Sequence, residues 1–277
     1  MALKSSEKMV IAYYPGNDFP SVSVTGTRCD QMCEHCRGVH LRGMIPVSGK
    51  DEFSDLAHSL RDRGCTGLLL SGGCDANGSV PVSPHADAIS KVSSDLLVNV
   101  HAGFITKNEA ERLAVSGISC FSVDIHQDRG EMRTVLHLDR EPEDYSKLLD
   151  ILMSTGVKVV PHMTVGFGYN DLNLSGDLVA SKGLKDVVLL SMVPTPGTMV
   201  EESVISEDAV MDAIGILREK GLNVILGCMR DRSLRILERR CIEAGITRLA
   251  NPSLETLKWA EDNGYSVVKR KICCCFD

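Results

Sequence analysis

The stretch VTGTRCDQMCEHC, residues 24–36, decides how the rest of the chain is interpreted. It places Cys29, Cys33 and Cys36 on one short segment with the spacing C-x3-C-x2-C. For 11 cysteines placed at random in 277 residues, we expect only about 0.02 copies of this spacing. Three thiolates on one loop can each bind one iron of a [4Fe-4S] cluster, which leaves the fourth iron open. Zinc sites favour paired C-x2-C or Cys/His sets, so the x3 gap indicates a cluster rather than zinc.

Outward from this motif, short apolar runs alternate with amphipathic segments of helix length. The expected strands are residues 21–26, 67–71, 96–101, 120–125, 157–165, 187–192, 223–227 and 246–250. The expected helices are residues 51–63, 86–92, 107–115, 142–154, 174–182, 207–220, 233–243 and 253–263. Strands with β-branched centres and helix-length connections favour a parallel sheet. Eight such units predict an α/β fold, a (β/α)8 TIM-type barrel over residues 1–264. Residues 265–277 are expected to form a cysteine-rich, strand-like extension outside the barrel.

Active sites on such barrels lie at the carboxyl ends of the strands. The pair Gly72-Gly73 follows the second expected strand, where a tight turn is the default interpretation. Asp124 ends an otherwise apolar strand, and a carboxylate among apolar neighbours needs a partner. A histidine at a strand end is either a hydrogen-bonded structural residue or a functional one. The further candidates at strand ends are His101, His126, His162, Gly166 and Cys228.

Three adjacent cysteines, Cys273, Cys274 and Cys275, stand near the C-terminus. In an extended chain Cys273 and Cys275 would point the same way, with Cα atoms about 7 Å apart. That arrangement suits two ligands of one cluster, to which Cys228 could add a third. The alternative is a frayed tail of free thiols anchored by Phe276. Free cysteines are usually small buried hydrophobes. The remaining cysteines are interpreted as such packing residues: Cys65, Cys74, Cys120 and Cys241.

The composition excludes several classes of protein. A hydrophobic content of 43% and a charged content of 24% are those of a globular protein. No apolar run approaches the roughly 18 residues of a membrane span, and the N-terminus carries no signal-peptide core. We therefore expect a cytoplasmic protein, in which reduced thiols favour cluster ligation over disulfides. The net charge of −7 argues against binding to a nucleic-acid backbone.

The cysteine motif resembles that of radical S-adenosylmethionine (SAM) enzymes. In that family the open iron chelates SAM, and an electron from the cluster cleaves it to yield a 5′-deoxyadenosyl radical. The resemblance implies a [4Fe-4S] cluster on Cys29, Cys33 and Cys36, with SAM as the second cofactor. It also implies that His35, just before the third cysteine, lies near the adenine. The other implied SAM contacts are Gly72, Gly73, Asp124, His126 and Gly166.

The whole chain is similar to the biotin synthase and lipoyl synthase branch of that superfamily. Within it, the segment from residue 36 to residue 46 and the cysteine-rich tail resemble the two-component archaeal-type lipoyl synthases. This implies sulfur insertion into an octanoyl chain on a lipoyl carrier protein, with an auxiliary iron–sulfur cluster as the sulfur source. No cysteine trio precedes Cys29, which leaves Cys273, Cys274 and Cys275, with or without Cys228, as the second site.

The implied partners are the octanoylated carrier protein, a paralogous radical SAM subunit and a low-potential electron donor such as ferredoxin. Two alternatives remain open. One is a radical SAM enzyme of another cofactor pathway, acting by methylation, rearrangement or ring formation. The other is a non-catalytic iron–sulfur partner subunit, against which the complete cysteine motif and glycine pair argue.

Overall fold

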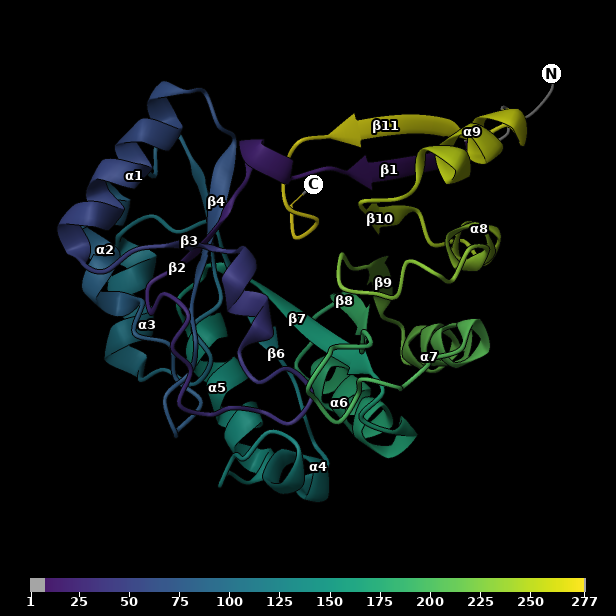
Figure 1. Cartoon of the computed structure of the whole chain (residues 1–277), viewed down its shortest axis with the longest axis horizontal. Coiled ribbons are helices and arrows are strands. Elements are labelled where there is room, and N and C mark those ends of the chain that lie inside the picture. The colour runs from purple at the N-terminus through teal and green to yellow at the C-terminus, as the bar shows by residue number, and fades with distance from the viewer. Residues whose placement is uncertain (1–7, 277) are drawn as a thin grey trace.

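A parallel sheet curls around the centre of the molecule and carries helices on its outer face (Figure 1). The computed structural model describes residues 8–276. The strands are β1 (Met9–Tyr13), β2 (Ser21–Ser23), β3 (Ile45–Pro46), β4 (Gly67–Ser71), β5 (Leu97–Val100), β6 (Cys120–Asp124), β7 (Lys158–Val165), β8 (Asp186–Ser191), β9 (Asn223–Leu226), β10 (Arg248–Ala250) and β11 (Ser266–Arg270). The α-helices are α1 (Lys50–Asp62), α2 (Ala86–Ser90), α3 (Lys107–Val115), α4 (Arg129–Thr134), α5 (Pro142–Ser154), α6 (Tyr169–Ser181), α7 (Glu207–Glu219), α8 (Leu237–Glu243) and α9 (Leu254–Asp262). Short 3-10 helices are η1 (Gly16–Asp18), η2 (Val39–Gly43) and η3 (Ser83–His85).

The sheet is open rather than closed. Its eleven strands run in the order β11-β1-β10-β9-β8-β7-β6-β5-β4-β2-β3, and the neighbours pair in parallel. A closed barrel of the expected strands would join β10 to β2. Instead β10 pairs with β1, and the outer edge of β2 pairs with β3. Within residues 8–276 the edge strands β11 and β3 do not pair with each other. The fold is therefore a curled α/β half-barrel, and not the closed (β/α)8 barrel expected from the sequence.

The eight expected strands are all present, as β2 and β4 to β10. The additional strand β1 was missed because only η1 separates it from β2, so it forms no strand–helix unit. Helix α4 was also missed, and α6 begins five residues before its expected start at residue 174. Within residues 8–276, no helix is both long and apolar enough to cross a bilayer.

Side chains that alternate along the strands form two apolar layers. On β7, Val159 joins the large core between the sheet and the helices, whereas Val160 faces the inside of the curl. The inner layer also contains Val188 and Ile225 from the neighbouring strands. Cys274, Cys275 and Phe276 belong to this same inner cluster. The C-terminal residues therefore fill the interior that the curled sheet surrounds, as Figure 1 shows.

Residues 271–276 contact both arms of the curled sheet, the arm that ends in β4, β2 and β3 and the arm that ends in β10, β1 and β11. On one arm, the Thr66 hydroxyl donates to the Lys271 carbonyl at 2.6 Å, and the rings of Phe19 and Phe276 lie 5.9 Å apart. On the other arm, Arg248 of β10 donates to the Cys274 carbonyl at 3.0 Å. The expectation of a tail outside the barrel is therefore wrong. β11 extends the sheet alongside β1, and the residues that follow turn inward.

A buried ion pair holds the loops that follow β9 and β10. Arg230 is 4% exposed and donates to the Ala250 carbonyl at 2.8 Å and to the carboxylate of Glu238. Glu238 also accepts the backbone N–H of Ser253 at 2.8 Å. Burial alone raises the pKa of Glu238, but the charge of Arg230 and the Ser253 bond hold that pKa below its usual value. The pair therefore ties α8 to two loops at the carboxyl end of the sheet.

We expect Arg230→Met to destabilise the fold strongly, because it leaves the Glu238 carboxylate buried without a partner. Breaking one side of a buried ion pair costs about 3–5 kcal/mol, which urea unfolding at neutral pH would measure. The control is Arg235→Met, since Arg235 is exposed and makes no ion pair with another described residue. Its effect should stay within about 0.5 kcal/mol. Equal losses in both variants would contradict the structural role of the pair.

The same pair predicts a pH dependence. A carboxylate whose pKa is lowered by folding stabilises the protein above its unfolded-state pKa, and this contribution disappears as the pH falls through the folded-state pKa. The difference in unfolding free energy between wild type and Arg230→Met should thus be full above about pH 5 and shrink below about pH 4. A difference that stays constant down to pH 3 would exclude Glu238 as its source.

Candidate functional site

A cavity of about 350 Å³ opens at the carboxyl ends of the strands. It brings together residues that lie far apart in the sequence. The predicted site residues in its wall are Cys29, Cys33, His35, Cys36, Gly72, Gly73, His101, Asp124 and His126. This is where the barrel rule places a site, because loops after successive parallel strands meet at one end of the sheet.

The cysteine loop is a series of tight turns. The backbone N–H of Arg37 donates to the Cys33 carbonyl at 2.8 Å, and that of Val39 donates to the Cys36 carbonyl at 2.8 Å. Arg37 and Gly38 have left-handed φ values of 43° and 73°, which reverse the chain directly after the third cysteine. These turns bring the thiols of Cys33 and Cys36 into contact.

Main-chain carbonyls after α4 hold this loop in place. The Gln31 amide donates to the Leu136 carbonyl at 2.7 Å, and the Glu34 N–H donates to the Val135 carbonyl at 2.8 Å. His137 adds an ion pair to Glu34 at 3.2 Å. The sequence carried no signal for these hydrogen bonds, because the main-chain carbonyl of any residue type could accept them. Leu136 and Phe167, which also line the cavity, were missed for the same lack of a motif.

The electrostatics of the loop favour one thiolate. A hydrogen bond from Cys33, helped by His35, lowers the pKa of the Cys36 thiol, although burial opposes this shift. The thiolate is the form that binds metals. Nearby, burial raises the pKa of Cys74 to about 12. Cys74 therefore stays protonated beside the motif, in keeping with its interpretation as a packing residue.

The glycine pair is required for close packing. A Cβ atom on Gly73 would lie 2.1 Å from the Arg28 carbonyl oxygen and 2.6 Å from the Cβ of Cys29. A Cβ on Gly72 would lie 2.9 Å from the Thr25 hydroxyl. The N–H of Gly73 already donates to that hydroxyl at 2.7 Å. The backbone after β4 therefore packs directly against the cysteine loop. A glycine pair that only formed a tight turn would not need this contact.

Two strand-end side chains form an ion pair in the cavity wall. Asp124 ends β6, and its carboxylate lies 3.2 Å from Nε2 of His101 after β5. Burial works to raise the pKa of Asp124, but the neighbouring His101 holds it well below its usual value. The carboxylate is 46% exposed, so an ionised acceptor faces the cavity. It can accept hydrogen bonds from an amine or from hydroxyl groups.

The other histidines of the wall differ in how they are held. His126 is 5% exposed, bonded to Asp171 at 3.3 Å and packed against Phe167. Nδ1 of His35, in contrast, is buried and has no hydrogen-bond partner among residues 8–276, and the His35 ring meets the Phe167 ring edge-on at 5.3 Å. An unpaired buried nitrogen is costly and suggests a partner that binds there. The three thiols and this nitrogen fit an incoming cluster and its ligand.

Three of the predicted strand-end residues, His162, Gly166 and Cys228, are not among the residues that line this cavity. Gly166 has a φ of 124°, and a Cβ there would lie 2.7 Å from Met192, so backbone packing explains this glycine. Cys228 is exposed, although the adjacent Met229 contributes to the wall.

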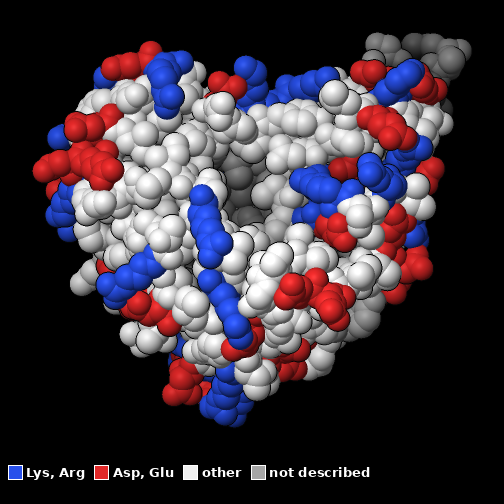
Figure 2. Space-filling view, viewed as in Figure 1, with Lys and Arg blue, Asp and Glu red and all other residues white. Residues whose placement is uncertain are grey.

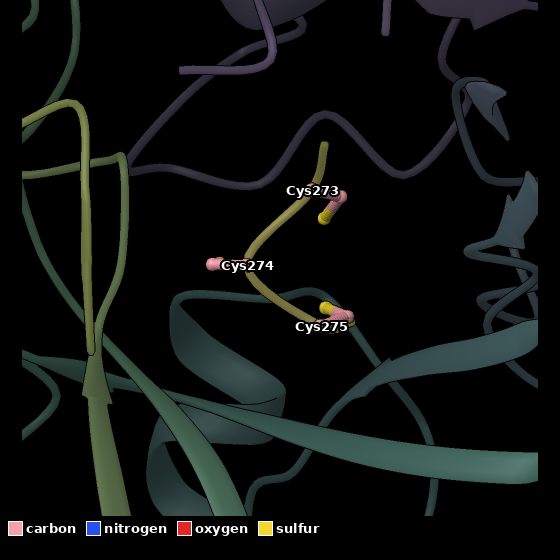
Figure 3. A group of neighbouring side chains, drawn as sticks. All are labelled: Cys273, Cys274 and Cys275. Atoms are coloured by element: carbon pink, nitrogen blue, oxygen red, sulfur yellow. The ribbon is translucent and has the colours of Figure 1, made fainter. Parts of the chain in front are cut away.

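The tail cysteines form a separate group inside the curl. Their three sulfur atoms lie within 4.8 Å of one another, and Figure 3 shows those of Cys273 and Cys275 on the same side of the chain. The chain here is a turn rather than an extended strand, since the Phe276 N–H donates to the Cys273 carbonyl at 3.1 Å. The expected shared direction of Cys273 and Cys275 is present, but their predicted extended backbone is not. Cys228 does not belong to this group.

No protein-family model matches the sequence, and no curated protein is significantly similar to it. Among solved structures, methylornithine synthase (PylB) matches with a TM-score of 0.64 and 12% identity over 95% of this chain and 85% of that one. The FeFe-hydrogenase maturase HydG from Carboxydothermus hydrogenoformans matches with a TM-score of 0.66 and 16% identity over 97% and 69%. Streptococcus suis SuiB bound to S-adenosylmethionine matches with a TM-score of 0.59 and 13% identity over 95% and 58%. The chain thus shares its fold with these three proteins, one of which was solved with S-adenosylmethionine bound, and at these identities the likeness reaches no further than the fold.

We expect Gly73→Ala to lower the iron content by about four per chain after anaerobic reconstitution, because the new Cβ displaces the cysteine loop. The matched control is Gly43→Ala in η2, where a Cβ meets no atom within 4 Å. That variant should retain the wild-type iron content. Full iron binding by Gly73→Ala would show that the contact with Cys29 does not position the motif.

Proposed function

We propose that the protein is a radical SAM enzyme in which Cys29, Cys33 and Cys36 hold a [4Fe-4S] cluster. The observation that carries this proposal is their convergence with His35, the glycine pair and Asp124 on one cavity. A cluster bound there would supply the electron that splits SAM into methionine and a 5′-deoxyadenosyl radical.

The chain's own residues have distinct parts in this proposal. The Asp124 carboxylate, kept ionised beside His101, accepts hydrogen bonds from the amine or ribose hydroxyls of SAM. His35 offers Nδ1, which has no hydrogen-bond partner in the described part of the chain, at the adenine side. The apolar remainder of the wall excludes water from a reactive carbon radical and suits an aliphatic substrate. These apolar residues include Leu69, Leu136, Leu138 and Leu148.

The substrate that we propose is an octanoyl chain on a lipoyl carrier protein, into which sulfur is inserted. An unactivated C–H bond requires a radical, and the new C–S bond requires a sulfur source nearby. The tail thiols are candidates to hold that source as an auxiliary iron–sulfur cluster. In support, Cys275 interacts with His162, whose ring stacks on His101 of the cavity wall at 5.9 Å.

The proposed partners are the octanoylated carrier protein, a paralogous radical SAM subunit and an electron donor such as ferredoxin. Support comes from the charge at the cavity mouth. Figure 2 shows Lys and Arg side chains on both sides of the central hollow, although the net charge is −7. Arg42 follows the cavity residue Leu41 in η2 and is exposed, as is Arg232, which also pairs with Glu238. Such a rim favours encounter with a partner that presents an acidic surface.

The double variant Cys273→Ala/Cys275→Ala should still form 5′-deoxyadenosine from SAM but should insert no sulfur into an octanoylated carrier domain. Cys36→Ala should lose both activities, because it removes a ligand of the cleaving cluster. Mass spectrometry of the carrier and chromatography of the nucleoside measure the two outcomes.

The control for this pair is Cys65→Ala, because the Cys65 thiol packs at the edge of the core and makes a single long hydrogen bond within residues 8–276, 3.6 Å to the Asn17 carbonyl. It should keep both activities. Sulfur insertion that persists in the double tail variant would overturn the sulfur-source role. Nucleoside formation without sulfur insertion by the wild-type protein would favour a radical SAM enzyme of another cofactor pathway.

A further inference from the structure

We infer that Cys120 completes a four-cysteine metal site inside the curl, together with Cys273, Cys274 and Cys275. The site takes an iron–sulfur cluster, an identity that rests on the function proposed above. Sequence patterns gave Cys120 only a packing role, because it begins an apolar strand.

Three of the four thiols are brought together by the turn at the C-terminus. After β11 the chain bends so that the Phe276 N–H donates to the Cys273 carbonyl. The sulfur atoms of Cys273, Cys274 and Cys275 then lie within 4.8 Å of one another. Cys274 and Cys275 are 6% and 0% exposed and Cys273 is partly buried, so the group is packed into the interior and is not a frayed end.

The fourth thiol comes from the sheet. Cys120 is the first residue of β6, is 0% exposed, and belongs to the same inner cluster as the tail. Cys120 pairs across the sheet with Asn99, whose amide contacts Cys273 Sγ, and Ser122 on the same face of β6 contacts Cys275 Sγ. The Cys120 thiol therefore faces the tail, although it lies outside the group of sulfurs within 4.8 Å. Strand β6 thus supplies one thiol, and the C-terminal turn supplies the other three. Four thiols are the usual number of ligands for an iron–sulfur cluster.

Polar side chains of the inner layer point at these sulfurs. The Asn99 amide lies 3.6 Å from Cys273 Sγ, and the Ser122 hydroxyl lies 3.4 Å from Cys275 Sγ. Both residues are buried, at 2% and 4% exposure. The Ser122 hydroxyl donates to Asn99 Oδ1 at 2.9 Å, which orients the Asn99 amide to donate to Cys273 Sγ. Hydrogen bonds to sulfur stabilise a cluster and tune its potential. Cys241 is equally buried, but it lies in the core between the sheet and the helices, where its sulfur contacts that of Met211.

Basic side chains lie beside these thiols, although Arg248 is also ion-paired with Asp186 at 2.7 Å. Arg248 donates to the Cys274 carbonyl, and the charge of Lys158 acts on Cys120. On the side toward the cavity, His162 interacts with Cys275 and stacks on His101. The four-cysteine site therefore lies one layer of side chains below the SAM cavity, within the same curl.

The test uses the full-length triple variant Cys29→Ala/Cys33→Ala/Cys36→Ala, so that only the inner site can bind iron. After anaerobic reconstitution with iron and sulfide, we expect about four irons and four sulfides per chain, with the visible absorption of a [4Fe-4S] cluster. Adding Cys120→Ala or Cys120→Val should lower the iron from about four to about three per chain, because the iron that Cys120 binds loses its protein ligand while the three tail thiols hold the others. Valine fills the volume of the lost thiol and suits a strand, and circular dichroism with urea unfolding verifies that each variant folds. Adding Cys241→Ala instead should leave iron unchanged.

The outcomes separate this inference from the proposed function. If the triple variant binds four irons and keeps them in both folded Cys120 variants, Cys120 is not a ligand and the inference fails, while the tail cluster stands. If the folded triple variant binds no iron, or binds only one zinc per chain, the inner cluster itself is wrong. Formation of 5′-deoxyadenosine by the wild-type protein reports on the radical SAM proposal independently of either result.

Discussion

A parallel sheet that curls without closing must cover the apolar inner face of its strands, and much of this structure depends on how that is done. The closing pairing from β10 to β2 is blocked, because β1 occupies one edge and β3 occupies the other. Residues 271–276 fill part of the interior instead, with Phe276 against Phe19 on one arm and Cys274 bonded to Arg248 on the other. The C-terminal residues therefore serve as core, and their thiols are buried because of it.

That arrangement places two groups of cysteines at two depths of one curl. At the mouth, the motif is held by backbone carbonyls after α4 and by contact with Gly73. Below it, the layer of His101, Asp124 and His162 separates the mouth from the tail thiols. A radical formed at the mouth and a sulfur source in the interior would both lie inside the curl, which is the geometric basis of the proposed sulfur insertion.

The sequence predicted much of this, where the signal is local. Strand positions followed from apolar runs, and the barrel rule then brought Cys29, Gly73 and Asp124 to one cavity. What could not be predicted depends on long-range contacts. Only the short η1 separates β1 from β2, so β1 forms no strand–helix unit and was not predicted. The main-chain hydrogen bonds to the cysteine loop have no residue signature, and Cys120 looks like any buried cysteine until the folded chain places the tail beside it.

The central claim is that the thiols and polar groups at the mouth support radical chemistry by this chain alone. Its most direct test is to reconstitute the protein anaerobically, reduce it and measure 5′-deoxyadenosine formed from SAM without any partner subunit. We predict formation of the nucleoside together with methionine, and its loss in Cys36→Ala. No nucleoside from a protein that carries a full, reducible [4Fe-4S] cluster would contradict the account and favour a non-catalytic iron–sulfur subunit.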